Sequence, residues 1–143
     1  MKPIIIRGIA SSTRVDLHAE RMTRKALFDM ARQINAGGIA ISLDHSRISV
    51  GVWTKARVKG TKLYVKGEID PVKVKYISKH LKLGLSIGGS REKFHLRRSG
   101  SSFKSVRICD RVALAEISIG SGPANKDSIL TSSIDWIQTG VVN

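Results

Sequence analysis

The apolar residues of this chain come in short runs, and most of these runs have the composition of β-strands. The clearest pair is Val50–Val58 and Leu63–Ile69, which flank Lys59-Gly60-Thr61-Lys62 and predict a β-hairpin. In the first arm, strand alternation would place Trp53 on the same exposed face as the cations Lys55, Arg57 and Lys59. Further strands are expected from runs of the same kind, Pro3–Ile9, Ile39–Leu43, Val106–Asp110 and Val112–Ile119.

Three other stretches predict helices. The first is capped by Thr23, stops at Gly37 and has apolar residues at helical spacing, namely Leu27, Met30, Ala31 and Ile34. The second is expected to start at Asp70-Pro71, an N-cap acceptor followed by proline, and to end at Gly84. Lys126–Gly140 is expected to form a terminal helix, although its β-branched residues disfavour one.

Length and composition predict one soluble domain, residues 1–143. No apolar run approaches the roughly 18 residues of a membrane span, and the N-terminus lacks the features of a signal peptide. The single cysteine, Cys109, excludes an intrachain disulfide and favours a reducing compartment. The His and Cys residues show no metal-ligand spacing and there is no phosphate-binding glycine loop, so neither a metal nor a cofactor is expected.

The chain is strongly basic, with 25 Lys and Arg against 11 Asp and Glu and a formal net charge of +14. Such a charge predicts attraction to an acidic partner, which composition leaves open as DNA, RNA, an acidic protein segment or an anionic surface. The cations are scattered and only 5% of the residues are aromatic, which favours a solvated basic surface over a dedicated nucleic-acid groove. The basic, Ser- and Gly-rich stretch Arg91–Ser105 predicts a hairpin tip or mobile loop.

One polar side chain, Ser86, stands in the apolar stretch Leu83–Gly89. If Leu85 and Ile87 face a core, Ser86 and Gly88 face the other way, with little bulk beside the hydroxyl. A nucleophilic serine needs this access, together with a base and donors for the oxyanion.

Two further residues would complete a serine hydrolase site. His45 follows a short apolar strand, and Glu116 lies within another, where an ionised carboxylate is costly unless it is paired. His45 would take the proton of Ser86, and Glu116 would accept a hydrogen bond from the other ring nitrogen. The order His, Ser, Glu differs from that of chymotrypsin, subtilisin and the α/β-hydrolases. Backbone amides near Gly120–Gly122 are the candidate oxyanion donors.

Other interpretations of these residues remain open. Each of the three also has a structural interpretation, as a strand-end serine, a turn histidine or a glutamate paired with an arginine. Ser90 is an alternative nucleophile, expected on the same face as Ser86. Asp44 is a poor third member, because adjacent strand residues point to opposite faces. Cys109 is expected to be an inert small hydrophobe.

Four runs of the sequence, in order, resemble the successive motifs of the prohead proteases of tailed phages. They are Leu43–Trp53, Leu63–Ile69, Leu83–Gly88 and Leu114–Asn125. The resemblance spans about Asp16–Asn125, and it is to capsid maturation proteases whose fold is similar to herpesvirus assemblin.

This resemblance implies an α+β fold, herpesvirus protease-like, with a small, mostly antiparallel β-barrel and flanking helices. The core motifs would lie in residues 16–125, followed by an extension at 126–143. It implies a serine endopeptidase with His45 as base, Ser86 as nucleophile and Glu116 as third member. Its substrates would be scaffold and major capsid protein, processed inside the assembling procapsid in the host cytoplasm. Self-cleavage and homo-oligomers are also implied, without a cofactor or membrane and with nucleic acid not required.

Two other classes of function remain open. A basic nucleic-acid-binding module would bind through charge, lose affinity steeply with salt and be indifferent to a change at Ser86. A catalytically silent, protease-like assembly factor would bind scaffold but would not react with an activated serine probe.

Overall fold

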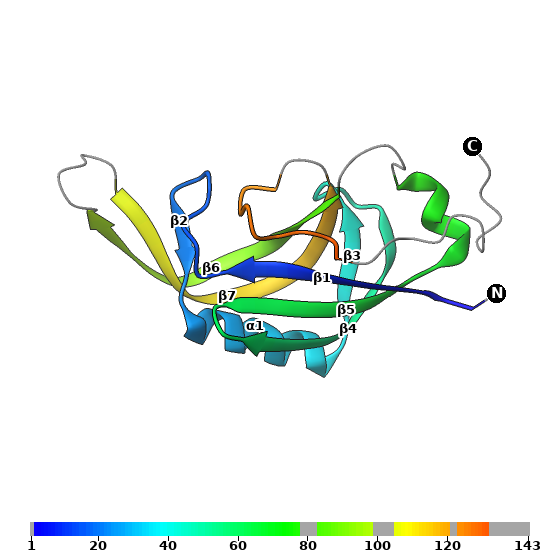
Figure 1. Ribbon diagram of the computed structural model, residues 1–143, viewed down its shortest axis with the longest axis horizontal. Helices are drawn as coiled ribbons and strands as arrows, with labels where there is room; N and C mark the ends of the chain where they lie inside the picture. Colours follow the sequence, from blue (N-terminus) through cyan, green and yellow to red (C-terminus); the bar gives the residue numbers. More distant parts are fainter. Residues whose placement is uncertain (1, 78–82, 99–104, 121–122, 132–143) are drawn as a thin grey trace.

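The computed structural model describes residues 2–77, 83–98, 105–120 and 123–131 (Figure 1). Over these residues the chain is an α+β fold made mostly of strands, with one α-helix and one short 3-10 helix. The elements are β1 (Ile4–Ser12), β2 (Glu20–Met22), α1 (Arg24–Ala36), β3 (Ile39–Leu43), β4 (Ser49–Lys59), β5 (Lys62–Ile69), η1 (Pro71–Tyr76), β6 (Gly84–Arg98) and β7 (Ser105–Gly120).

The strands form a single curled sheet, a half-barrel rather than the small β-barrel that was expected. The order is β1-β5-β4-β3-β7-β2, and β6 pairs with β7 in addition. The β3–β7 and β2–β7 pairs are parallel and the others are antiparallel. Strand β7 therefore pairs along both edges. Its residues Glu116 to Ile119 pair with both β3 and β6, and so set the register of these two strands relative to each other.

Long strand pairing alters two of the sequence predictions. Val106–Asp110 and Val112–Ile119 belong to one strand, β7. The stretch Arg91–Ser105, expected to be a hairpin tip or mobile loop, belongs to a hairpin in which residues up to Arg98 continue β6 and Ser105 begins β7, with 99–104 outside the described residues. The β6–β7 ribbon projects from the body of the sheet (Figure 1). This part of the ribbon is polar and largely exposed. Its sequence therefore lacks the alternation of apolar and polar residues that identifies a half-buried strand. The short strand β2 was also missed.

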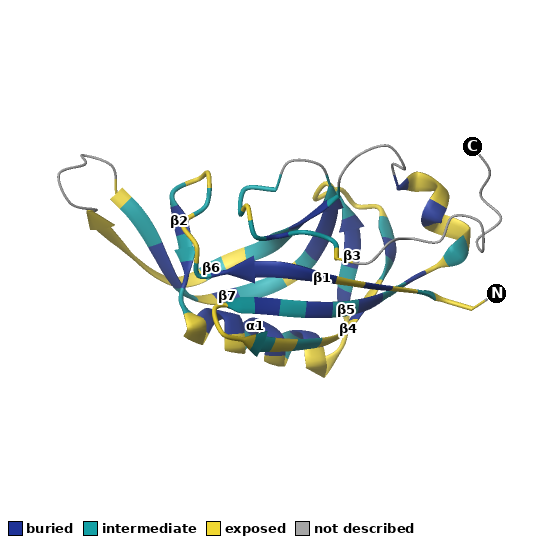
Figure 2. Cartoon of the chain, viewed as in Figure 1, coloured by how far each residue is buried: buried dark blue, intermediate teal, exposed yellow. Residues whose placement is uncertain are grey.

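Helix α1 was predicted correctly. Thr23 accepts a hydrogen bond from the Ala26 amide at 3.2 Å, and Gly37 ends the helix with a φ of +96°. The helix lies under the sheet and buries one face against it, while its opposite face is exposed (Figure 2). Its buried residues are Ala26, Leu27, Met30, Ala31 and Ile34.

The other two predicted helices differ from what is observed. Asp70 caps the start as expected, but only the 3-10 turn η1 forms, and Ile77 already has extended geometry. The rest of that prediction, residues 78–82, lies outside the described residues. Ile129 and Leu130 make β-bridges, consistent with the strand preference of β-branched residues, and residues 132–143 are likewise outside. No helix in the described ranges is long and apolar enough to cross a membrane.

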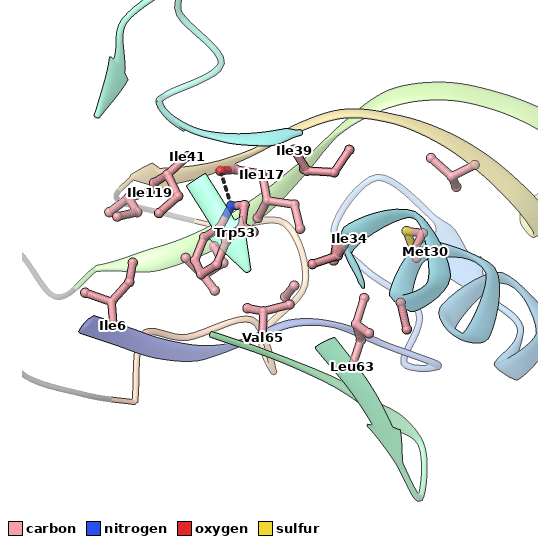
Figure 3. Packing of buried hydrophobic residues seen from close by; sticks show 14 of the residues in the cluster. Ile6, Met30, Ile34, Ile39, Ile41, Trp53, Leu63, Val65, Ile117 and Ile119 are labelled. Atoms are coloured by element: carbon pink, nitrogen blue, oxygen red, sulfur yellow. Dashed lines mark hydrogen bonds between the residues drawn. The ribbon is translucent and has the colours of Figure 1, made fainter. Parts of the chain in front are cut away.

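Trp53 lies at the centre of the core and not on the exposed cationic face. It is 0% exposed, and its indole N–H donates to the Ile117 carbonyl at 3.1 Å (Figure 3). The pairing of β4 with β5 shifts register between Trp53 and Lys55, which leaves Thr54 as a bulge. A bulge inserts one residue and reverses the alternation beyond it, so Trp53 points inward and Lys55 outward.

The segment 128–131 bridges the two free strands at the open side of the half-barrel. Leu130 pairs with Gly8 of β1, and Ile129 pairs with Gly84 of β6. The amide of Thr131 donates to the Arg7 carbonyl at 2.9 Å. This bridge covers only one end of the gap between β1 and β6, and the other end remains available for a cleft.

The absence of a side chain at Gly67 makes room for the buried indole, and this generates a test of the core. A Cβ there would lie 2.8 Å from Trp53 Cε3 and 2.9 Å from Ile41 Cδ1. We expect Gly67→Ala to lower the free energy of unfolding by about 1–3 kcal/mol through overpacking. Urea titration would measure it, with Thr61→Ala in the exposed β4–β5 turn as control. Equal unfolding midpoints for Gly67→Ala and the parent chain would contradict this packing.

Candidate active site

His45 is presented by a tight turn that follows β3. Asp44 and His45 both have positive φ, +46° and +57°, a left-handed conformation that residues other than glycine adopt only when the surroundings hold it. The amide of Asp44 donates to the Ile119 carbonyl at 3.1 Å, and the amide of His45 donates to Ser118 Oγ at 2.8 Å. Strand β7 therefore holds the turn in place, and the imidazole extends over β7 towards β6.

Ser86 meets this imidazole from β6. Its Oγ lies 2.8 Å from His45 Nε2. In the sheet Ser86 is directly opposite Ser118, while its neighbour Leu85 is 1% exposed and enters the core. The expected alternation therefore holds at this point, with the hydroxyl on the face away from the core.

Glu116 contacts the other side of the ring. Its Oε1 lies 2.5 Å from His45 Nδ1, and its Oε2 accepts a hydrogen bond from Ser118 Oγ at 2.6 Å. The side chain is only 16% exposed, and both carboxylate oxygens have partners. The expectation that something must hold this carboxylate is thus confirmed.

The small residue Gly88 makes this contact possible. It pairs with Glu116 across the sheet, and a Cβ at Gly88 would overlap the Oε1 atom that contacts His45. Ala40 flanks Glu116 from the other side in the same register. The carboxylate therefore lies between Ala40 and Gly88, two residues that contribute almost no side-chain volume.

The three side chains form one continuous hydrogen-bonded chain. With a proton on Nδ1 donated to Glu116, the imidazole presents the lone pair of Nε2 to the Ser86 hydroxyl. A carboxylate at Nδ1 favours this tautomer and stabilises the imidazolium that forms when the ring takes a proton. The arrangement can activate the Ser86 oxygen as a nucleophile.

Ser86 and His45 open into a cleft of about 400 Å³. Ala10, Ser11 and Ser12 of β1 line it on one side, and the β6 residues Ser86, Ile87 and Arg91 line it on the other. Ser128 of the bridging segment and Asn125, three residues before it, also line the cleft. The cleft thus occupies the part of the β1–β6 gap that the bridge does not cover.

A buried carboxylate, Glu20, lies in the wall of the cleft. It is 4% exposed and receives hydrogen bonds from Arg91 at 3.0–3.3 Å. Arg107 Nε lies 2.9 Å from Glu20 Oε2, close enough for an ion pair although without hydrogen-bond alignment. Arg91 also donates to the Gly89 carbonyl at 2.9 Å, so this cluster fixes β2 against β6 beside the cleft.

Asp127, the residue just before the bridging segment, connects that segment to the end of β1. It accepts a hydrogen bond from Ser12 Oγ at 2.7 Å and forms an ion pair with Arg14 at 3.3 Å. The Ser12 hydroxyl, and then the Arg14 guanidinium, hold the pKa of the Asp127 carboxyl below its ordinary value. Its ionised form therefore stabilises the rim of the cleft.

The remaining candidates do not join the site. Ser90 is exposed and does not line the cleft. The register shift between Gly88 and Gly89 leaves Ala115 of β7 unpaired, so the alternation along β6 continues unbroken from Ser86 to Ser90. Ser90 therefore keeps the expected face of β6 but lies outside the cleft. The Asp44 carboxylate lies against Gly120 rather than the imidazole. Cys109 is buried, and burial raises the pKa of its thiol.

Sequence patterns pointed to three members of the hydrogen-bonded chain and missed the fourth, Ser118. It lies two residues after Glu116, so strand alternation alone places both on one face. Gly120 lines the cleft, whereas residues 121–122 of the predicted oxyanion donors lie outside the described part. No group of three potential metal ligands occurs among the described residues.

No protein-family model matches the sequence, and no match is found among curated proteins or solved structures. The chemistry of the site is therefore inferred from its geometry.

The fit of Gly88 against Glu116 can be tested without any substrate. In Gly88→Ala we expect the flexible end of Glu116 to swing away from His45, because moving a carboxylate is easier than moving the backbone. The chain should remain folded while the downfield proton resonance of the His45 Nδ1–H···Oε1 hydrogen bond disappears from the NMR spectrum. Ser90→Ala should retain the resonance. If Gly88→Ala also retains it, the packing described here is wrong.

Proposed function

We propose that this protein is a serine endopeptidase in which Ser86 is the nucleophile, His45 the general base and Glu116 the residue that orients and stabilises the imidazole. One observation carries the proposal: a single imidazole contacts the serine hydroxyl through Nε2 and a nearly buried carboxylate through Nδ1. Nucleophile, base and orienting acid in this order are the requirement for acyl transfer by a serine.

The reaction would proceed in two halves. Ser86 Oγ forms a bond to the carbonyl carbon of the substrate as its proton passes to His45 Nε2. The imidazolium is stabilised by Glu116 and gives that proton to the departing amine as the peptide bond breaks, leaving an acyl ester on Ser86. A water molecule then repeats the sequence, losing its proton to His45 and displacing the serine oxygen, which recovers the proton.

The free edge of β6 favours a polypeptide as the substrate. Beyond Leu85, the backbone partners recorded for β6 within the described residues all belong to β7. The unpaired edge therefore carries amide and carbonyl groups beside Ser86 along the cleft. An extended chain can hydrogen-bond to such an edge and so bring a peptide carbonyl to the nucleophile.

The finer identity that we propose is a herpesvirus protease-like prohead protease. The motif resemblance supports it, because three of the four runs carry site residues: Leu43–Trp53 holds His45, Leu83–Gly88 holds Ser86 and Leu114–Asn125 holds Glu116. The proposal includes scaffold and major capsid protein as substrates inside the assembling procapsid in the host cytoplasm. It also includes self-cleavage and a homo-oligomeric state.

Substitution of the three residues tests the activity. Ser86→Ala should abolish labelling by a fluorophosphonate probe and lower peptide cleavage by about 10³-fold or more, with the fold intact. His45→Ala should lose nearly as much, and Glu116→Gln about a hundredfold. Intact-mass spectrometry would measure labelling, with Ser90→Ala as the matched control.

Two results would contradict this assignment. One is cleavage of a scaffold or capsid substrate by Ser86→Ala at the parent rate, and the other is equal loss in Ser86→Ala and Ser90→Ala. A parent chain that binds scaffold but neither labels nor cleaves would instead be a silent assembly factor.

Ser118 should act as a positioning residue. Ser118→Ala removes the donor to Glu116 Oε2 and the acceptor of the His45 amide, so the rate of probe labelling should fall about tenfold. The KM for a peptide should change little, because the hydroxyl acts through other residues. Ser118→Thr keeps the hydroxyl and should recover part of the rate. Equal rates for the alanine and threonine variants would exclude this role.

A further inference from the structure

The outer face of β1, β5 and β4 carries a row of cations in direct register. Lys66 of β5 is paired with Arg7 of β1 on one side and with Lys55 of β4 on the other. The next pairs along the hairpin are Arg57 with Tyr64 and Lys59 with Lys62. Alternate residues Leu63 and Val65 enter the core, so these polar side chains point outward.

This register is unfavourable for the fold itself. Like charges directly opposite one another destabilise a sheet, and the three strands contain only one acidic residue, Glu68. Within the described residues, no ion pair joins Lys55, Arg57 or Lys66 to a carboxylate. The Thr54 bulge creates the arrangement, because it turns Lys55 and Arg57 to the face of Lys66.

The same side chains line a pocket of about 630 Å³. Lys55, Arg57, Lys66 and Tyr64 contribute to it, together with Asn35 from α1 and Thr131 from the bridging segment. None of its lining residues lines the cleft that holds Ser86. It is therefore a separate surface, and we call Lys55, Arg57 and Lys66 with this pocket the basic sheet face.

The spacing and composition of this face favour an acidic polypeptide over a nucleic acid. Lys55, Arg57 and Lys59 alternate along one strand, about 6.6–6.8 Å apart, which is also the repeat of alternate side chains in an extended peptide. Tyr64 is the one aromatic ring among the lining residues, whereas single-stranded nucleic acid binding relies on several stacked rings.

We propose that the basic sheet face is an exosite that binds an acidic, extended segment of polypeptide substrates away from the cleaved bond. The bridging segment connects the two places, because Ser128 lines the cleft and Thr131 lines the basic pocket. A chain held at the exosite would keep its neighbouring residues close to Ser86 and so raise their effective concentration. The effect on cleavage rests on the proposed peptidase function, but the binding itself does not.

Binding would be measured in a Ser86→Ala background, so that it is independent of catalysis. The exosite variant is Lys55→Gln with Arg57→Gln and Lys66→Gln, and the matched control is Lys25→Gln with Lys73→Gln and Arg111→Gln, which neutralises three exposed cations elsewhere. The probes are a fluorescent peptide of alternating glutamate and serine, its glutamine and serine analogue, and an oligothymidylate of equal charge.

The acidic peptide should bind about tenfold more weakly to the exosite variant and nearly unchanged to the control. Thermal unfolding should occur at the same or a higher temperature in the exosite variant, because neutralisation relieves the like-charge row, so misfolding would not explain the loss. If both variants lose the same affinity for the acidic peptide, net charge alone explains the binding. If the oligothymidylate binds tightly and the peptide does not bind, the face is assigned to nucleic acid. Either result overturns the proposal.

A second comparison separates this proposal from the peptidase itself. With Ser86 intact, the exosite variant should cleave a substrate that carries the acidic segment more slowly than the parent chain, through a higher KM, and should cleave a short substrate without that segment at the parent rate. Loss of cleavage of both substrates would contradict an exosite. Absence of cleavage by the parent chain would count against the peptidase, leaving the binding result to stand by itself.

Discussion

The pairing of β7 with both β3 and β6 is the constraint on which the candidate site depends. Ser42, Ser118 and Ser86 lie in one row across these three strands, and Ala40, Glu116 and Gly88 lie in the next. A slip of one residue would turn Glu116 and Ser118 into the core and bring Ile117 to the cleft. The buried residues Ile41, Ile117 and Leu85 on the opposite face prevent that slip, so core packing maintains the geometry of the site.

Polar groups at low exposure are consistently paired around the cleft. Glu116 is held by His45 and Ser118, and Glu20 is held by two arginines. Each carboxylate would be costly to bury alone, and each has at least one partner from outside its own strand. The same interactions that compensate for burial therefore also fix the orientation of the imidazole and the position of β2 against β6.

Charge is used differently at the cleft and on the basic sheet face. At the cleft, cations such as Arg14 and Arg91 are matched by carboxylates. On the basic sheet face, Lys55 and Lys66 are opposed to each other in register, and within the residues described neither has an acidic partner. The net charge of +14 is therefore not a uniform coating, because part of it is neutralised at the cleft and part is concentrated on one outer surface.

Local sequence determined much of this protein. Thr23 and Gly37 delimit α1, the β4–β5 hairpin follows its turn residues, and the alternation of Leu85, Ser86 and Ile87 shows which way the hydroxyl points. These features depend on capping, turn chemistry and residue period, which act over a few residues. The isolated polarity of Ser86 and Glu116 in apolar strands likewise marked them as candidates before their partners were known.

Tertiary structure alone decided the rest. The bulge at Thr54 decided that Trp53 is buried and Lys55 exposed, because one extra residue reverses the alternation and leaves no mark in composition. Long-range pairing extended β6 through polar residues up to Arg98. The convergence of His45, Ser86 and Glu116 also depended on long-range pairing. The distances among them are set by how β3, β6 and β7 align, and contacts between residues far apart in the chain determine that alignment.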